Sequence, residues 1–168
     1  MPRTLFDFSE MFVGCIHTED FTNAVKKEEI KLLLANSFIV MQDCSSRYWK
    51  EFAEDTDNCH EVKSEYIKSR IGELIGWKKR EIEELERKLI WQIPISQEVR
   101  LFGILEKNKP TRNNNLFQVL LFDPNHKTYR KSGKNVLSSL KDLVCLFNED
   151  EECQELIIQK SLKKNKRK

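Results

Sequence analysis

The spacing of apolar residues changes near Pro94, and this change limits what the chain can fold into. Before Pro94, apolar side chains recur every three or four residues, which is the period of an amphipathic helix. After it, they gather in short runs of strand length bounded by turn residues. A helix does not continue through a proline, because the ring clashes with the preceding turn. The sequence therefore predicts helices followed by strands, an α+β domain.

Two long helices are predicted before this point, at residues 26–54 and 61–90. The first carries an apolar stripe formed by Ile30, Leu33, Leu34, Phe38, Met41, Ser45, Tyr48 and Phe52. The second carries a stripe formed by Val62, Tyr66, Ile67, Ile71, Leu74, Ile75, Ile82, Leu85 and Leu89. The connection between the two helices is short and rich in turn residues, which favours a long antiparallel helical hairpin. Gly72 and Gly76 either let this hairpin pack closely or mark a kink, and we interpret them as points of close packing.

A three-stranded antiparallel meander is predicted to follow and to pack under the hairpin. Its first two strands are the apolar runs 99–105 and 116–122, and a turn at Asp123-Pro124-Asn125-His126 leads to a third strand at 127–131. C-terminal helices are expected near 135–147 and 150–162. We expect residues 1–162 to form a single domain and residues 163–168 to be a disordered basic tail.

Length and hydropathy support one domain in the cytoplasm. The chain has 168 residues, of which 39% are hydrophobic and 33% are charged, a balance typical of a globular domain. No apolar run approaches the roughly 20 residues that span a bilayer, and the N-terminus lacks the pattern of a secretory signal. We therefore expect a cytoplasmic protein with no membrane partner.

The charge is strongly segregated, and one segment is basic. The net charge is only +2, but residues 107–134 hold seven lysines and arginines against Asp123 alone. A cationic hairpin with an aromatic ring suits a phosphodiester backbone and a stacked base. The plainer interpretation is a solvated edge hairpin whose lysines prevent pairing with other sheets. The residues predicted to bind nucleic acid are Arg100, Lys107, Lys109, Arg112, Lys127 and Lys134.

The strand-turn-strand Leu116–Tyr129, LFQVLLFDPNHKTY, resembles the corresponding segment of the RelE/ParE-like toxin superfamily. The order of helices followed by a small antiparallel meander resembles that group as well. Nucleases of the group cleave messenger RNA without a metal, by means of basic and aromatic residues on the sheet. The resemblance implies a cleavage site that includes Arg100. Its catalytic residues would be His126, Tyr129, Arg130 and Lys131, with His126 as the base and Tyr129 or a lysine as the acid.

The five cysteines do not form a recognisable framework. Their number is odd and no CxxC occurs, so reduced thiols are more plausible than disulfides. Cys15-x-His17 and Cys59-His60 could together supply four zinc ligands. However, adjacent Cys and His chelate poorly, and the usual spacers are missing. We interpret these residues as partly buried thiols and ordinary histidines, and we predict no metal and no cofactor.

Two functions from different classes remain. The first is RNA binding or metal-independent endoribonuclease activity of the toxin type. The second is a non-catalytic protein-interaction module, or a small subunit of a larger complex, that docks through the helical hairpin. The expected partner is RNA in the first case, and another protein or a second copy of the chain in the other. No phosphate-binding loop, dinucleotide fingerprint, HExxH or GxSxG occurs to point elsewhere.

Overall fold

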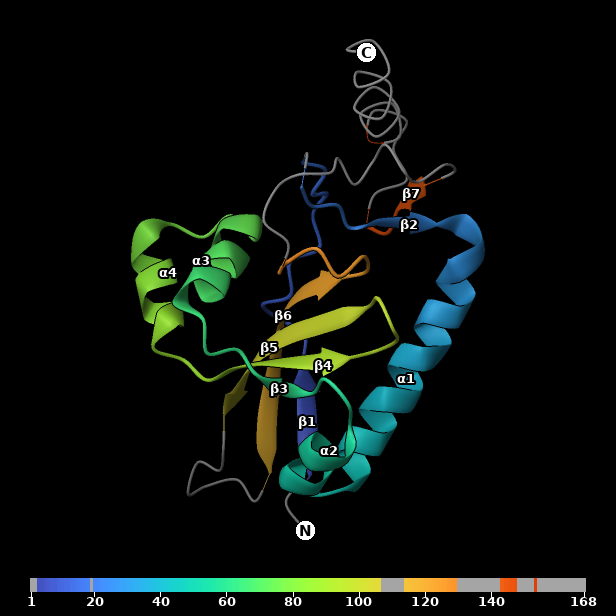
Figure 1. The fold of residues 1–168 in the computed structure, drawn as a ribbon, viewed down its shortest axis with the longest axis vertical. Helices are drawn as coiled ribbons and strands as arrows, with labels where there is room; N and C mark the ends of the chain where they lie inside the picture. The colour runs from blue at the N-terminus through green and yellow to red at the C-terminus, as the bar shows by residue number, and fades with distance from the viewer. Residues whose placement is uncertain (1–2, 19, 107–113, 130–142, 148–152, 154–168) are drawn as a thin grey trace.

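A mixed five-stranded sheet forms the centre of the computed structural model, which describes residues 3–18, 20–106, 114–129, 143–147 and Cys153 (Figure 1). The strand order is β1-β6-β5-β4-β3. β1 runs parallel to β6, and the other neighbours are antiparallel. The strands are β1 (Thr4–Asp7), β3 (His60–Glu61), β4 (Ile90–Pro94), β5 (Arg100–Glu106) and β6 (Asn115–Asp123). A separate antiparallel pair joins β2 (Ala24–Lys26) to β7 (Leu143–Cys145).

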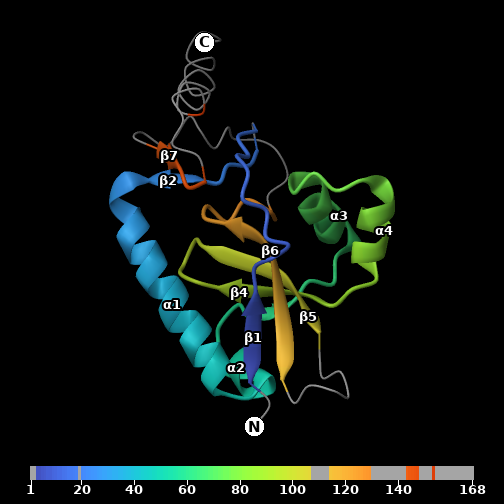
Figure 2. The same cartoon turned by 180° about the vertical axis from the view of Figure 1, so that it is seen from behind.

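Helices lie on both sides of the large sheet (Figures 1 and 2). The short 3-10 helix η1 (Lys27–Glu29), α1 (Ile30–Ser46) and α2 (Trp49–Asp55) follow β2 on one side. On the other side lie α3 (Glu65–Leu74) and α4 (Lys79–Glu86). Leu101 packs with the α1 and α2 side chains, whereas its neighbour Phe102 packs with those of α3 and α4, because successive side chains of a strand point to opposite faces.

The expected long helical hairpin on a three-stranded meander is wrong. The first predicted helix is interrupted at Arg47, whose φ of −120° and ψ of 168° are extended values. The second is interrupted at Gly76, whose φ of +77° belongs to the left-handed region that favours glycine after a helix C-terminus. Gly72 faces Ile82 closely, so this glycine lets α3 approach α4 rather than the first helix. α4 ends at Glu86, and Ile90, the last residue of the predicted second helix, begins the strand β4.

Two of the three predicted meander strands exist, as β5 and β6, and they pair antiparallel. The third does not follow them, because residues 124–129 form turns and the neighbours of the β5–β6 pair are β4 and β1 instead. The helix expected near 135–147 is wrong at residues 143–145, which form β7. Residues 130–131, most of the predicted 150–162 helix and the 163–168 tail lie outside the described residues. Within the described ranges, no helix has the length and apolar character needed to cross a bilayer.

Gly103 sits beside a register shift in β5 and has no room for a side chain. A Cβ there would lie 2.5 Å from the carbonyl oxygen of Gln118 and would also meet the Phe117 ring. Since this oxygen belongs to the sheet backbone, it cannot move aside alone, and Gly103→Ala should lower the free energy of unfolding by about 3 kcal/mol. At Gly76, an added Cβ would meet no neighbouring atom within 4 Å. Gly76→Ala should therefore lower the free energy of unfolding by only about 1–2 kcal/mol, because alanine disfavours the left-handed backbone. Urea unfolding of both variants checks the difference, and equal losses would contradict it.

Candidate functional site

Helix α1 carries apolar residues on every side, yet most of it faces solvent. Its 17 residues include only two charged ones, Lys31 and Asp43, and only Leu33 and Cys44 are buried. Large apolar side chains are more than half exposed: Leu32 at 64%, Leu34 at 54%, Phe38 at 68% and Ile39 at 63%. Helices of this character are normally buried on all sides. The outer surface of α1 therefore has the composition of an interface.

The exposed apolar residues of α1 form two stripes. Leu32, Ala35 and Ile39 are spaced by three and four residues and share one face, while Leu34, Phe38 and Met41 share another. The second stripe lines a pocket of about 400 Å³ between α1 and the sheet, and Ser37 is the one polar residue among those that line it. We call the first stripe, with Gln42 one turn further along, the α1 seam. It contains no charged residue.

The predicted nucleic-acid-binding residues fall into two groups. Arg100, at the start of β5, is only 4% exposed and donates hydrogen bonds from Nη1 to the carbonyl oxygens of Ser96 and Val99, at 2.6 and 2.9 Å. Burial lowers the pKa of its guanidinium. Lys127 is half-buried in the turn after β6. The remaining basic residues of the prediction lie outside the described residues: Lys107, Lys109, Arg112, Arg130, Lys131 and Lys134.

The segment after β6 is folded by a buried carboxylate. Asp123, fully buried, accepts hydrogen bonds from the backbone N–H and hydroxyl of Thr128 at 2.7 and 2.8 Å, and from the backbone N–H of Asn125 at 3.2 Å. The chain therefore curls around the carboxylate instead of returning as a strand. His126 takes a positive φ of 51° in this turn, a conformation in which asparagine, aspartate and histidine are enriched.

The turn brings the ring of Tyr129 close to two imidazoles, and one of them, that of His60, was not predicted to lie at this site. The Tyr129 ring lies 5.8 Å from that of His126 and 6.3 Å from that of His60, measured between centroids. The Tyr129 hydroxyl is buried and finds no hydrogen-bond partner in the described part of the chain. Burial raises the pKa of Tyr129 to about 12. The sequence did not predict that His60 lies near Tyr129, because its position depends on the pairing of β3 with β4.

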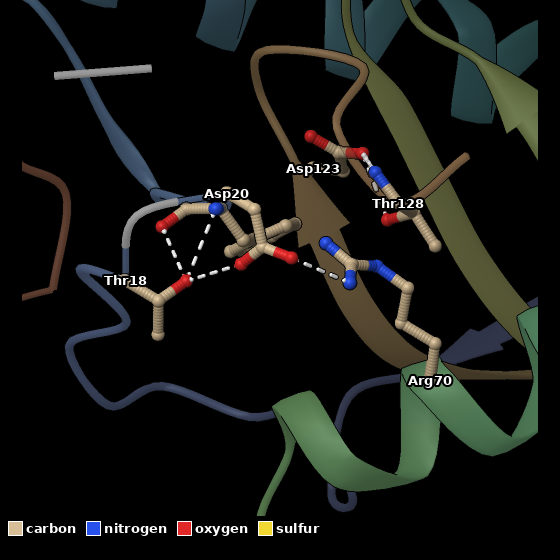
Figure 3. A network of polar contacts seen from close by, with 6 residues as sticks. Thr18, Asp20, Arg70, Asp123 and Thr128 are labelled. Atoms are coloured by element: carbon tan, nitrogen blue, oxygen red, sulfur yellow. Dashed lines mark hydrogen bonds and ion pairs between the residues drawn. The ribbon is translucent and has the colours of Figure 1, made fainter. Parts of the chain in front are cut away.

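A second polar network fixes the loop between β1 and β2 against α3 (Figure 3). Arg70 of α3 bonds the carboxylate of Asp20 at 2.8 Å, and the Thr18 hydroxyl donates to the same carboxylate at 2.9 Å. Asn23 closes the other end of the loop, since its side chain accepts from the Ile16 N–H and donates to the Gly14 carbonyl, at 3.0 and 2.7 Å. Residues 14–18 are therefore held in place from two sides.

This loop carries Cys15 and His17, which the structure brings together with Cys145 and Cys153. The four ligand atoms, three Sγ and one imidazole nitrogen, lie within 4.8 Å of one another. His17, Cys145 and Cys153 are buried, and Cys15 lies at the surface. Cys59 and His60, the other two residues considered as zinc ligands in the sequence, are elsewhere. Cys59 is buried in the core beside α2, and the exposed His60 donates from Nδ1 to the Glu61 carbonyl.

Sequence reasoning missed Cys145 and Cys153 because they follow the loop by about 130 residues. The pairing of β2 with β7 places Cys145 opposite Ala24, and no local pattern predicts this pairing. Burial and the neighbouring thiols raise the pKa of the Cys153 thiol.

The two remaining cysteines should be chemically inert in the folded protein. Burial raises the pKa of Cys44 and of Cys59 to about 12, and only the thiolate is an effective nucleophile. At pH 8, four pH units below this pKa, roughly one molecule in ten thousand carries the thiolate at either position. Brief treatment with iodoacetamide at pH 8 should therefore leave both unmodified in the native chain and modify both in urea. Peptide mass spectrometry checks this, and rapid native labelling of either residue would contradict it.

The described elements define a mixed α/β domain, with helices on both sides of a five-stranded sheet and a small second sheet. A cluster of three thiols and one imidazole lies beside the second sheet. The chain belongs to the family described as Uncharacterised protein UU032, whose model matches residues 7–151. No match to the chain was found among curated proteins or among solved structures.

Proposed function

We propose that this protein is a non-catalytic interaction module that pairs with a second copy of itself through the α1 seam. The observation that carries the proposal is the exposure of Leu32 and Ile39, at 64% and 63%, on a helix with almost no charge. Burying such side chains contributes about 1.5–3 kcal/mol each. A partner that covers these two side chains therefore gains more binding free energy than it would gain by covering polar side chains.

The order of residues along the seam favours a second copy in antiparallel orientation. If two α1 helices cross near Ser37, the small Ala35 of each copy lies opposite the large Ile39 of the other, and Leu32 lies opposite Gln42. Lys31 then comes level with Asp43 of the other copy, so like charges do not meet. Such a contact is self-complementary, as a two-fold symmetric interface requires, and the small residue lets the two helices approach closely.

Photo-crosslinking tests which surface pairs with the seam. A benzophenone amino acid in place of Ile39, in the full chain, should give a crosslinked product of twice the chain mass, with the attachment on α1 near Ala35 of the second copy. The same group in place of Arg80, whose side chain is 90% exposed on α4, serves as the control and should give little product. Attachment from position 39 outside α1, or equal yields from both positions, would overturn the proposal.

Metal-independent RNA cleavage at the turn after β6 is the second candidate function. The observation that favours it is the placement of two imidazoles, His126 and His60, beside Tyr129. An imidazole suits RNA cleavage because it can remove the 2′-hydroxyl proton while a separate acid protonates the leaving oxygen. Tyr129, whose pKa is raised to about 12, stays protonated at neutral pH and would act as the acid.

A further inference from the structure

The cluster of Cys15, His17, Cys145 and Cys153 has the dimensions of a metal site. The Sγ of Cys15 lies 3.2 Å from the Sγ of Cys145 and 3.2 Å from that of Cys153. The Nε2 of His17 lies 3.2 Å from the Sγ of Cys153. In a zinc tetrahedron with Zn–S bonds of about 2.3 Å, neighbouring sulfurs are about 3.8 Å apart. The sulfur–sulfur contacts of 3.2 Å and the 4.8 Å that limits all pairs of ligand atoms bracket this value.

We propose that the protein binds one Zn²⁺ ion through the Sγ atoms of Cys15, Cys145 and Cys153 and the Nε2 of His17. Three thiolates and one imidazole in a closed tetrahedral arrangement are typical of structural zinc. The three thiols release their protons to solvent when the metal binds. All four positions are filled by protein atoms, so the ion has no open position for a substrate and its role is to hold the chain together.

The imidazole is already oriented for this role. Nδ1 of His17 lies 2.8 Å from the hydroxyl oxygen of Thr22, and this oxygen also accepts a hydrogen bond from the backbone N–H of Ala24. When Nε2 binds the metal, the imidazole proton sits on Nδ1, where it donates to the free lone pair of the Thr22 oxygen. Partners of this kind commonly fix the orientation of zinc-binding histidines.

The backbone also presents the four groups from fixed positions. The loop of Cys15 and His17 is held by Asn23 and, through Asp20, by Arg70. Cys145 lies on β7, in register with Ala24 of β2. A metal at this point joins the loop before β2 to the chain after β7, which are more than 100 residues apart in sequence. It would therefore stabilise the two-stranded sheet.

A disulfide is the competing arrangement for these sulfurs. Cys15 contacts both Cys145 and Cys153 at the same 3.2 Å, whereas a disulfide joins two sulfurs at about 2.05 Å. Any one disulfide would leave the third thiol and the imidazole without a role. The two arrangements differ by two hydrogens in the mass of the metal-free chain, so they can be distinguished directly.

Metal analysis of the full chain tests the proposal. Protein purified with zinc in the medium should contain one zinc per chain, and the metal-free protein should take up one Co²⁺ with the absorption of a tetrahedral thiolate complex. His17→Ala, Cys145→Ser and Cys153→Ser should each lose the stoichiometric metal and the cobalt spectrum. His60→Ala and Cys59→Ser, which change a histidine and a cysteine outside the cluster, are the matched controls and should retain both.

Thr22 provides a test that leaves every ligand in place. Thr22→Val removes the hydroxyl that orients His17 and should weaken zinc binding about 10- to 100-fold, whereas Thr22→Ser keeps the hydroxyl and should bind nearly as tightly as the wild type. Competition with a chromophoric chelator measures both affinities. A wild-type chain without stoichiometric zinc or cobalt uptake, a native disulfide within the cluster, or equal metal content in the ligand variants and their controls would overturn the proposal.

Discussion

Replacing Ile39 by glutamate should weaken self-association of the protein at least about 100-fold, which corresponds to about 2.7 kcal/mol. In the proposed dimer this residue lies at the centre of the α1 seam and packs against Ala35 of the second copy. The substitution places a carboxylate in an apolar contact, and the two-fold symmetry does so twice. Because Ile39 is 63% exposed in the single chain, the fold itself should tolerate the change. Sedimentation velocity over a range of concentrations measures the effect.

Leu89→Glu is the matched control for Ile39→Glu. Leu89 is also an exposed apolar residue, at 42%, but it lies between α4 and β4, away from α1. The control should leave the dissociation constant of the dimer within a factor of about 3, and both variants should keep the circular dichroism spectrum of the wild type. An equal effect of the two substitutions would show that added charge, not the α1 seam, controls association.

If the protein cleaves RNA, His126→Ala and Tyr129→Phe should each lower the cleavage rate by roughly two orders of magnitude, the usual effect of losing a general acid or base. The raised pKa of Tyr129, about 12, sets the direction of the pH dependence. The phenol loses its proton only as the pH rises toward 12, so activity that needs this proton should not fall between pH 7 and pH 10 through Tyr129.

Initial rates on a single-stranded RNA measure both variants, with Arg80→Ala on the exposed face of α4 as the control. The thermal unfolding of each variant must match that of the wild type, because Tyr129 is packed against Phe102. Two fully active single variants would remove the turn after β6 from consideration as a nuclease site.

The strands β5 and β6 could be predicted because their apolar runs are continuous and bounded by turn residues. β4 could not, because Ile90 continues the helical spacing of the residues before it and Pro94 looks like the end of a helix. Pro94 in fact ends a strand, in register with Arg100. The pairing of β1 with β6 joins Thr4 to Asn115, and no local pattern records a contact across such a distance.

The exposed face of α1 and the cysteine cluster also depend on contacts between segments that are distant in the sequence. The apolar stripe of the first predicted helix was expected to lie against a second long helix. Leu34 and Phe38 were therefore expected to be buried. The structure exposes both, because the chain after α2 forms β3 and then continues to the other side of the sheet. From the sequence, Cys15 and His17 were interpreted as a partly buried thiol and an ordinary histidine. Their neighbours Cys145 and Cys153 depend on the β2–β7 pairing, which only the folded chain reveals.

Sedimentation equilibrium of the wild-type chain tests self-association through α1 most directly, since it measures mass without labels or substitutions. The 168-residue chain has a mass of 20.0 kDa. The proposal predicts an equilibrium that reaches twice this mass as the concentration increases through the micromolar range, and that returns to the single-chain mass on dilution. A single-chain mass at every concentration up to the millimolar range would contradict it.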